Sequence, residues 1–321
     1  MLMKKILVTG GAGFIGSNFV RKFSRLEDYH FHVVDSLTYC GNLDNIRDLS
    51  ITFEKLDIRD GEKVRELFER NDFAGVIHFA AETHVDNSIR YPNIFFDTNV
   101  MGTLNLLNCI GDSRLIHVST DEVYGELLEG DPCFTEDSPL APSSPYSASK
   151  ASSDLLVRSY FKTYGSDVVI TRCSNNYGPF QHAEKLIPKV IEKAIRGEKV
   201  PVYGDGANIR DWIYVDDHIE GIWRAFKEGR AGEVYNFGGG AEKRNIEVVR
   251  LILEKLGSKS KIEFVEDRKG HDYRYGIDYG KAQRELGWSP RVSFEEGIGA
   301  TINFYNQTRS EQNFKAWVKT T

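Results

Sequence analysis

Apolar runs and helical stretches alternate along the first half of the chain. Continuous apolar runs fall at Lys5–Thr9, Phe31–Asp35, Thr52–Leu56, Gly75–Phe79 and Arg114–Ser119. The stretches between them have a helical pattern, at Phe14–Leu26, Gly61–Arg70 (with Asp60 as a candidate N-cap) and Asn93–Ile110. Strands without polar alternation are typical of a parallel sheet that helices cover on both faces. The pattern therefore predicts a doubly wound, mostly parallel α/β (Rossmann) sheet, which binds ligands outside the carboxyl ends of its strands.

The second half of the chain is less regular. Helical segments at Lys185–Arg196 and Asn245–Leu256 are separated by loops rich in glycine, arginine, aspartate and aromatic residues. We expect residues 1–177 to form the sheet domain and residues 178–321 to form mainly a smaller C-terminal substrate-binding lobe. Apolar runs at Trp212–Val215 and Val234–Phe237 indicate that the chain returns to the first domain near residues 212–240.

Composition narrows the classes of function. The chain has 321 residues, of which 40% are hydrophobic and 27% charged, as in an ordinary globular protein. No stretch approaches the roughly 20 apolar residues that a membrane span needs. The net charge of −6 disfavours nucleic-acid binding, so an anionic ligand would need local cations. The four cysteines have neither paired nor metal-ligand spacing, which predicts reduced thiols, a cytoplasmic location and no metal site.

A glycine-rich turn, Thr9–Gly16, joins the first predicted strand to the first predicted helix. In a dinucleotide-binding turn, Gly10 permits the sharp bend, Gly13 lets the backbone approach a pyrophosphate, and Gly16 allows close helix packing. The amino end of the helix then offers free N–H groups and a positive dipole to the phosphates. An ordinary βα turn is the alternative reading of the glycines taken alone.

Asp35 strengthens the prediction of a dinucleotide site. It closes the second strand about 20 residues after the glycine turn, where a carboxylate accepts hydrogen bonds from the ribose hydroxyls. A carboxylate there also repels a 2′-phosphate, which predicts NAD rather than NADP. Asp57 and Ile58, at the end of the third strand, are candidates for adenine contacts.

A tyrosine and a lysine form the first candidate catalytic pair. Tyr146 and Lys150 lie one helical turn apart, after a proline that favours a helix start. A nearby cation lowers the pKa of a phenol, so that tyrosinate can act as a base toward a sugar hydroxyl. An exposed pair on a solvated helix is the alternative.

With the glycine turn, the Tyr146–Lys150 motif resembles that of the extended short-chain dehydrogenase/reductase family. The resemblance implies that Tyr146 removes a hydroxyl proton and that Lys150 tunes the phenol and holds the nicotinamide ribose. It further implies that Thr120, at the end of the fifth strand, binds the same hydroxyl.

Two adjacent carboxylates, Asp121 and Glu122, follow Thr120. This pair is similar to the one that marks the dTDP-glucose 4,6-dehydratases of that family. The resemblance implies oxidation of the sugar at C4, removal of the C5 proton by Glu122, protonation of the departing C6 hydroxyl by Asp121, and return of the hydride to C6. Neighbouring carboxyls favour the opposite protonation states that such a division requires.

Three alternatives stay open at this point. A UDP-hexose 4-epimerase or a UDP-glucuronate decarboxylase would need the same tyrosine, lysine and NAD, but not Asp121 and Glu122. A non-catalytic NAD-sensing protein could share the fold without needing an intact catalytic set. An Asp-Glu pair is also commonly a solvated loop feature.

The resemblance assigns further contacts residue by residue. Additional cofactor contacts fall after the strands, at Phe14, Ile15, Ser36, Leu37, Thr38, Phe79, Ala80, Ala81, Thr98 and Asn176, with Cys40 where alanine is usual. Substrate contacts fall at Thr83, Thr120, Asn175, Lys185, Leu186, Pro201, Tyr203, Arg210, Asn245, Arg268 and His271. The cations among them would hold a diphosphate, although taken singly each reads as a surface salt bridge.

The resemblance also predicts a homodimer. Members of the family pair through two helices per subunit, packed as a four-helix bundle. The candidate helices here are Asn93–Ile110 and Ser147–Tyr164.

Overall fold

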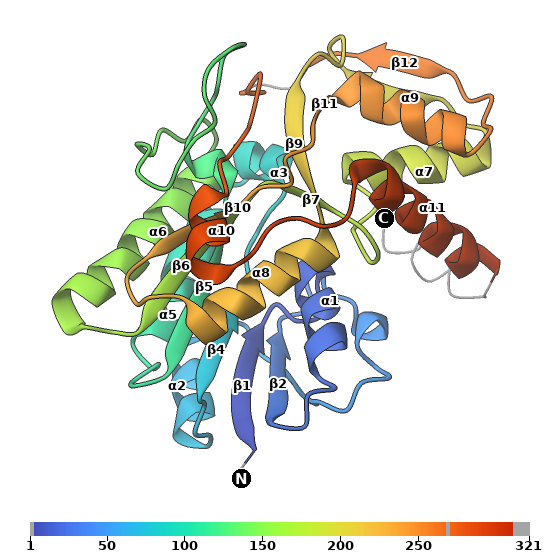
Figure 1. The fold of residues 1–321 in the computed structure, drawn as a ribbon. Helices are drawn as coiled ribbons and strands as arrows, with labels where there is room; N and C mark the ends of the chain where they lie inside the picture. The colour runs from blue at the N-terminus through green and yellow to red at the C-terminus, as the bar shows by residue number, and fades with distance from the viewer. Residues whose placement is uncertain (1–2, 268–269, 311–321) are drawn as a thin grey trace.

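A seven-stranded parallel sheet lies at the centre of the structure, a computed structural model that describes residues 3–267 and 270–310 (Figure 1). The strand order is β10-β6-β5-β4-β1-β2-β3. The strands are β1 (Lys4–Thr9), β2 (Tyr29–Asp35), β3 (Thr52–Lys55), β4 (Gly75–His78), β5 (Arg114–Thr120), β6 (Val168–Cys173) and β10 (Val234–Phe237). The order reverses direction between β1 and β4, which opens a crevice at their carboxyl ends. The predicted doubly wound parallel sheet is confirmed.

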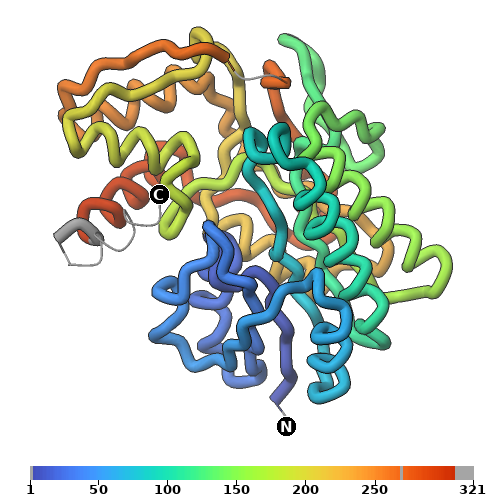
Figure 2. The backbone as a smooth tube through the Cα atoms, turned by 180° about the vertical axis from the view of Figure 1, so that it is seen from behind, coloured from blue at the N-terminus to red at the C-terminus, as the bar shows by residue number. Residues whose placement is uncertain are grey.

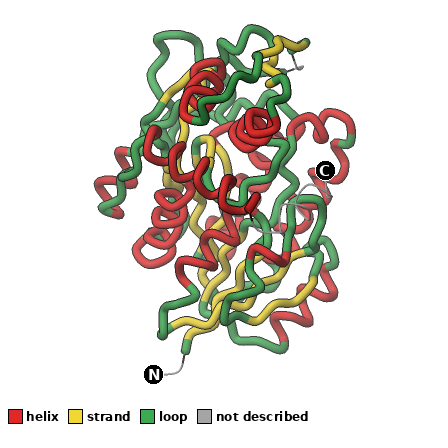
Figure 3. The backbone as a smooth tube through the Cα atoms, turned by 90° about the vertical axis from the view of Figure 1, so that its right-hand side faces the viewer, coloured by secondary structure: helices red, strands yellow, loops and turns green. Residues whose placement is uncertain are grey.

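Helices cover both faces of this sheet, so the strands are apolar throughout. One face carries α1 (Phe14–Phe23), α8 (Val215–Glu228) and α10 (Gly280–Leu286), and the other carries α2 (Gly61–Glu69), α5 (Thr103–Leu107) and α6 (Pro145–Tyr164). Within β1, Ile6 and Val8 pack into the first hydrophobic cluster and Leu7 packs into the second. Figure 3 shows the strands running between the helical layers.

The predicted long helix near Asn93–Ile110 is present, but it is not α-helical throughout. It runs without a break through α4 (Pro92–Phe96), a π-helical turn η2 (Asp97–Gly102) and α5, and the short helix α3 (Val85–Arg90) precedes it. A π turn inserts one extra residue, a change that hydrophobic periodicity does not reveal, and such turns are frequent at functional sites. Within η2, Asn99 bonds the backbone N–H and carbonyl of Glu82 and the hydroxyl of Ser149 on α6.

A smaller lobe is built from later parts of the chain around a third hydrophobic cluster. It contains α7 (Leu186–Arg196), α9 (Asn245–Lys255), α11 (Phe294–Ser310) and the parallel pair β8 (Val200–Tyr203) and β12 (Ile262–Val265). A three-stranded sheet, β11 (Glu242–Arg244), β9 (Ile209–Tyr214) and β7 (Asn175–Tyr177), leads from this lobe back to the central sheet. In Figure 2 the lobe lies beside the carboxyl ends of the central strands.

The two apolar runs of the second half of the chain lie in different sheets. Val234–Phe237 becomes β10 and joins the central sheet beside β6, whereas Trp212–Val215 lies in β9 and at the start of α8. Two 3-10 turns, η1 (Leu43–Asn45) and η3 (Asp121–Val123), follow β2 and β5. No helix in the described ranges is both long and apolar enough to cross a bilayer.

Candidate functional site

One cavity of about 930 Å³ occupies the carboxyl ends of the central strands. Every predicted cofactor residue and every predicted catalytic residue contributes to its lining. The cofactor group is Gly10, Gly13, Phe14, Ile15, Gly16, Asp35, Ser36, Leu37, Thr38, Asp57, Ile58, Phe79, Ala80, Ala81, Thr98, Tyr146, Lys150 and Asn176, and the catalytic group adds Thr120, Asp121 and Glu122. The fold thus brings both groups to one place.

The glycine turn is shaped by close backbone contacts. Gly10 has a φ of +68°, and a Cβ there would lie 2.6 Å from the backbone nitrogen of Ala80. A Cβ on Gly16 would lie 2.3 Å from the carbonyl oxygen of Gly10. Gly13 caps α1 without a side-chain hydrogen bond, and the first turn of α1 has no acidic residue. The helix amino end therefore faces the cavity ready for an anion.

Asp35 lies at the end of β2 with its carboxylate fixed from two sides. Its Oδ2 accepts the backbone N–H of Ala12 at 3.0 Å, and its Oδ1 accepts that of Leu37 at 2.8 Å. Burial raises the pKa of Asp35, while these two hydrogen bonds oppose the shift. The carboxylate is consequently held in place on the cavity wall, where a ribose would lie.

The catalytic candidates converge where β5 ends and α6 begins. Ser144 caps α6 and Pro145 opens it, which presents Tyr146 and Lys150 on the helix face that packs against β5. Thr120 ends β5 within hydrogen-bonding reach of the Tyr146 hydroxyl. The Lys150 ammonium donates to the carbonyl of Val118 at 2.9 Å.

The predicted effect of Lys150 on Tyr146 is wrong for this structure. Burial, followed by the nearby charge of Glu122, raises the pKa of Tyr146 well above its usual value. Burial also lowers the pKa of Lys150 to about 8. The ammonium points to a backbone carbonyl, so the desolvation of the phenol outweighs its attraction to the lysine.

Asp121 and Glu122 meet different surroundings although they are neighbours in the chain. Asp121 is buried, and its Oδ2 has no hydrogen-bond partner within the described ranges. Burial raises the pKa of Asp121 well above its usual value, the charges of Glu122 and Asp211 add to the shift, and Arg210 opposes it. Glu122 is only half-buried and lines the cavity. The pair can therefore supply one protonated acid and a second carboxyl at the same edge of the sheet.

Three of the predicted substrate residues join Thr120 in the cavity lining: Thr83, Asn175 and Lys185. The Oδ1 atom of Asn175 is buried without a hydrogen-bond partner in the described part of the chain. Lys185 donates to the carbonyl of Thr83 at 3.2 Å. Asn175 therefore offers an unused acceptor, and Lys185 offers a cation, at the cavity wall.

The other predicted substrate residues do not line this cavity. Leu186, Pro201, Tyr203, Arg210, Asn245 and His271 lie in the smaller lobe or at its junction with the central sheet, and Arg268 is outside the described residues. Arg210 is buried, donates to the carbonyl of Asp272 at 2.9 Å, and stacks on Tyr275 at 4.3 Å. Its charge still reaches the catalytic pair, because it lowers the pKa of Asp121.

The sequence analysis missed several residues of the cavity wall. Tyr39, Glu82, Phe180, Gln181 and His182 line the cavity and come from the loops after β2, β4 and β7. Only their position after the carboxyl ends of strands indicated that they could line the cavity. Their residue types belong to no motif that would single them out.

Comparisons with known proteins extend over nearly the whole chain. The model of the GDP-mannose 4,6 dehydratase family matches residues 7–301. The low-salt glycan biosynthesis protein Agl12 of Haloferax volcanii is 51% identical over 308 residues, which cover 94% of this chain and 98% of that protein. A dTDP-glucose 4,6-dehydratase of Xanthomonas campestris pv. campestris is 49% identical over 330 residues, which cover 94% of this chain and 93% of that protein.

A solved structure shows the same likeness in three dimensions. The crystal structure of DesIV (dTDP-glucose 4,6-dehydratase) from Streptomyces venezuelae, with NAD and TYD bound, has a TM-score of 0.91 and 48% sequence identity to this chain. The match covers 95% of this chain and 98% of that one. The similarity therefore includes both the central sheet and the smaller lobe.

Proposed function

Because the chain belongs to the GDP-mannose 4,6-dehydratase family, we propose that it is an NAD-dependent dTDP-glucose 4,6-dehydratase. Its product is dTDP-4-dehydro-6-deoxyglucose, an intermediate of deoxysugar biosynthesis. The observation that carries the proposal is the buried Asp121 beside Glu122, placed directly after Thr120 in the cavity that contains the glycine turn. An epimerase or a decarboxylase of this fold has no use for that pair.

The residues of the glycine turn and the strand ends would hold the cofactor. The amino end of α1 would bind the diphosphate, Asp35 the adenosine ribose, and Asp57 with Ile58 the adenine. Bound NAD supplies a hydride acceptor for C4 of the sugar and then a hydride donor for C6. Since the cofactor is regenerated in each turnover, the protein has no need to release it.

Tyr146 would begin the reaction by removing the proton of the C4 hydroxyl. Thr120 would hold that hydroxyl, because both side chains meet at the same point of the cavity. Lys150 would bind the nicotinamide ribose, and its ammonium is anchored by Val118. Because burial raises the pKa of Tyr146, the phenol must first lose its own proton to solvent, and the positive charge of a bound nicotinamide would favour that ionisation.

Glu122 and Asp121 would carry out the elimination. The C4 ketone acidifies the C5 proton, and Glu122 removes it. Asp121, kept protonated by burial, gives its proton to the C6 hydroxyl, which leaves as water. Glu122 would return its proton to C5 when C6 takes up the hydride. The proton that Tyr146 removed from the C4 hydroxyl would replace the one that Asp121 gave up, so that the protein regains its starting state.

We assign the remaining contacts to the nucleotide-sugar. Thr83, Asn175 and Lys185 lie at the cavity wall and are suited to the sugar and the first phosphate. The more distant group would bind the diphosphate and the base: Leu186, Pro201, Tyr203, Arg210, Asn245, Arg268 and His271. Arginines in this group suit the charge of a diphosphate on a protein that is acidic overall.

We further propose a homodimer in the cytoplasm. The elements α4, η2 and α6 pack against one another and expose Phe96, Met101 and Leu155. Large apolar side chains exposed on neighbouring elements favour an interface there. All four cysteines are unpaired, as expected in a reducing compartment.

Product identification tests the proposed function. The purified protein with NAD is mixed with dTDP-glucose, and the nucleotide-sugar is analysed by mass spectrometry. We expect loss of one water. An isomer of unchanged mass from dTDP- or UDP-glucose would establish an epimerase instead, and loss of carbon dioxide from UDP-glucuronate would establish a decarboxylase.

The variant Tyr146→Phe provides the matched control for catalysis. It should abolish turnover while NAD stays bound, because only the hydroxyl is removed. Wild-type protein that binds NAD but leaves every one of these sugars unchanged would contradict the assignment and favour an NAD-sensing protein.

A further inference from the structure

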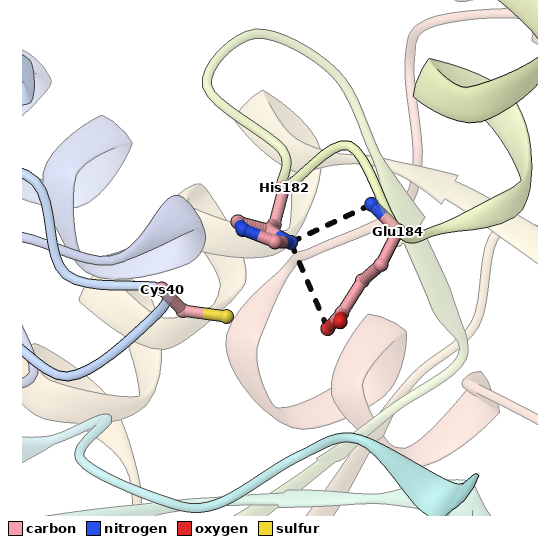
Figure 4. Close-up of side chains that lie close together, drawn as sticks. All are labelled: Cys40, His182 and Glu184. Carbon is pink, nitrogen blue, oxygen red and sulfur yellow. Dashed lines mark hydrogen bonds and ion pairs between the residues drawn. The ribbon is translucent and has the colours of Figure 1, made fainter. Parts of the chain in front are cut away.

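Three potential metal ligands from distant parts of the chain meet at the rim of the cavity (Figure 4). Cys40 lies in the loop after β2, and His182 and Glu184 lie in the loop between β7 and α7. One ligand atom from each residue lies within 4.8 Å of the others. Among the described residues, no other group of three or more such side chains is gathered so closely.

The carboxylate of Glu184 is incompletely satisfied in this cluster. Its Oε2 is 3.0 Å from the Nε2 atom of His84. Its Oε1 is buried and has no hydrogen-bond partner in the described ranges, and the Nδ1 atom of His182 is 3.8 Å away. A buried oxygen left without a partner is costly, and an ion bound beside it is one of the ordinary explanations.

We propose that Cys40, His182 and Glu184 bind a divalent cation of the zinc type. One sulfur, one imidazole nitrogen and one carboxylate oxygen match the preference of Zn²⁺, whereas Mg²⁺ and Ca²⁺ prefer oxygen ligands alone. Zinc bonds of about 2.0–2.3 Å would require the three atoms to approach by only about 1 Å. Water would occupy the fourth position on the cavity side.

The ionisation of His182 and Glu184 is compatible with such a site, whereas the Cys40 thiol must be deprotonated by metal binding. Burial lowers the pKa of His182, so its ring is neutral, as a ligand must be. Burial opposes ionisation of Glu184, but the hydrogen bond from His84 and the charge of Lys185 lower the pKa of Glu184 overall. Burial raises the pKa of the Cys40 thiol to about 12, so metal binding would have to displace its proton, which would pass to solvent when the metal–sulfur bond forms.

An ion at this position would join two loops that enclose the cofactor cavity. Leu37 and Phe180 lie in these same loops, line the cavity, and are the two non-glycine residues with positive φ in the described ranges (54° and 66°). Such conformations persist only where surrounding contacts hold them. The metal would act as a clamp across the rim and would slow the release of NAD.

The test uses the full-length chain, stripped of metal with a chelator. Zn²⁺ binding is measured by calorimetry, and Co²⁺ serves as an optical probe of a thiolate ligand. The variants are Cys40→Ala, which restores the residue usual in the resembling family, and His182→Gln. Cys133→Ala is the control, because Cys133 also lies near a carboxylate (Glu242, 3.7 Å) but outside the cluster.

We expect one ion per chain and a thiolate-to-cobalt absorption band in the wild type and in Cys133→Ala. Both should be lost in Cys40→Ala, and tight Zn²⁺ binding should also be lost in His182→Gln. A wild type without the band, or a band that persists in Cys40→Ala, would overturn the site. An NAD release rate that is the same with and without Zn²⁺ in the wild type would overturn the clamp.

These outcomes do not depend on the proposed reaction, since no sugar is present. Circular dichroism of each variant shows whether it is folded. If Cys40→Ala were unfolded, then His182→Gln, which leaves the cofactor loop intact, decides the question.

Discussion

At the scale of single residues, the two neighbouring carboxyls are separated by their environments. Asp121 is 2% exposed and Glu122 is half-buried, so a shift of one position along η3 changes the solvation of the group. Burial also dominates at Tyr146. It raises the pKa of the phenol although Lys150 lies one helical turn away. Local charge is therefore a poor guide to proton affinity in this cavity, and desolvation is the larger effect.

Replacing Asp121 with Asn should block the elimination and spare the first oxidation. An amide cannot deliver a proton to the C6 hydroxyl, so turnover should fall roughly 10²- to 10⁴-fold. Reduced cofactor should then accumulate during a single turnover, as measured by its near-ultraviolet absorbance. The wild-type rate should fall as pH rises through the raised pKa of Asp121, because the acid must be protonated.

The exposed Asp137 provides the control, since Asp137→Asn alters a carboxyl of the same region outside the cavity. It should leave both the rate and its pH dependence unchanged. An Asp121→Asn variant that cannot oxidise C4 would argue against the separation of roles between Tyr146 and Asp121.

At the scale of elements, a buried polar cluster fastens α6 to β5 and β6. Asp154 accepts Nε of Arg172 at 2.9 Å, and Nε2 of His117 lies 3.3 Å from its other oxygen. Arg172 also donates to the Tyr124 hydroxyl at 2.8 Å. Lys150 stands one helical turn before Asp154, so this cluster positions the helix that carries Tyr146 and Lys150.

Asp154→Asn should destabilise the fold by about 3–5 kcal/mol at pH 7, because it leaves the Arg172 charge buried without its partner. Burial opposes ionisation of Asp154, but the charge of Arg172 and the nearby His117 ring lower its pKa to about 2. A depressed carboxyl pKa stabilises the fold above the unfolded value near 3.9, and that stability is lost as pH falls toward 2. The measurement is urea unfolding of both proteins.

The difference in unfolding free energy between wild type and variant should be roughly 1 kcal/mol smaller at pH 3 than at pH 7. Asp167→Asn is the comparison, since Asp167 pairs with Arg114 at 2.9 Å in a more exposed position. It should cost no more than about 1 kcal/mol. Equal losses in the two variants would refute the special role of the buried cluster.

Elements with a regular sequence pattern could be predicted from the sequence. Features that depend on contacts between distant parts of the chain could not. Strands β1, β2, β4 and β5 could be located because both faces of a parallel strand are buried, which makes the run apolar. The π turn at Asp97–Gly102 breaks the periodicity on which helix prediction depends. The meeting of Cys40 with His182 depends on how the smaller lobe folds back, so no local spacing indicates it.

Most of the candidate site followed from local motifs. The glycine turn, Asp35, Tyr146 and Lys150 have fixed positions relative to their strands, so their convergence follows from the strand order. The protonation of the site could not be obtained in this way, because it depends on burial. We propose to retain residues 1–177 and 178–321 as the two functional units, with β10, α8 and α10 belonging structurally to the first.

At the scale of the whole molecule, the exposed apolar face of α4, η2 and α6 is the surface through which we propose that two chains pair. Leu155 is 57% exposed, although it lies on the helix that carries the catalytic tyrosine. Pairing of two such faces would bury them and stiffen α6 from outside. The proposed dimer thus has a structural reason beyond the removal of apolar surface from water.

Leu155→Arg should convert the dimer to a monomer, because it places a charge at the centre of the proposed interface. Size-exclusion chromatography with light scattering measures the mass. Phe264→Arg is the control, since Phe264 has the same exposure of 57% but lies on β12 in the smaller lobe. A monomeric wild type, or a dimer that survives in Leu155→Arg, would contradict the predicted bundle.

The late arrival of β10 in the central sheet has a consequence for how the protein is made. During synthesis the ribosome releases β1 to β6 well before Val234–Phe237, so β6 is first an open edge that exposes unpaired backbone groups. The nascent chain must keep that edge from pairing with other chains until the strand that covers it has emerged. We therefore expect slow translation or a premature stop between residues 173 and 234 to yield aggregates rather than a folded cofactor domain.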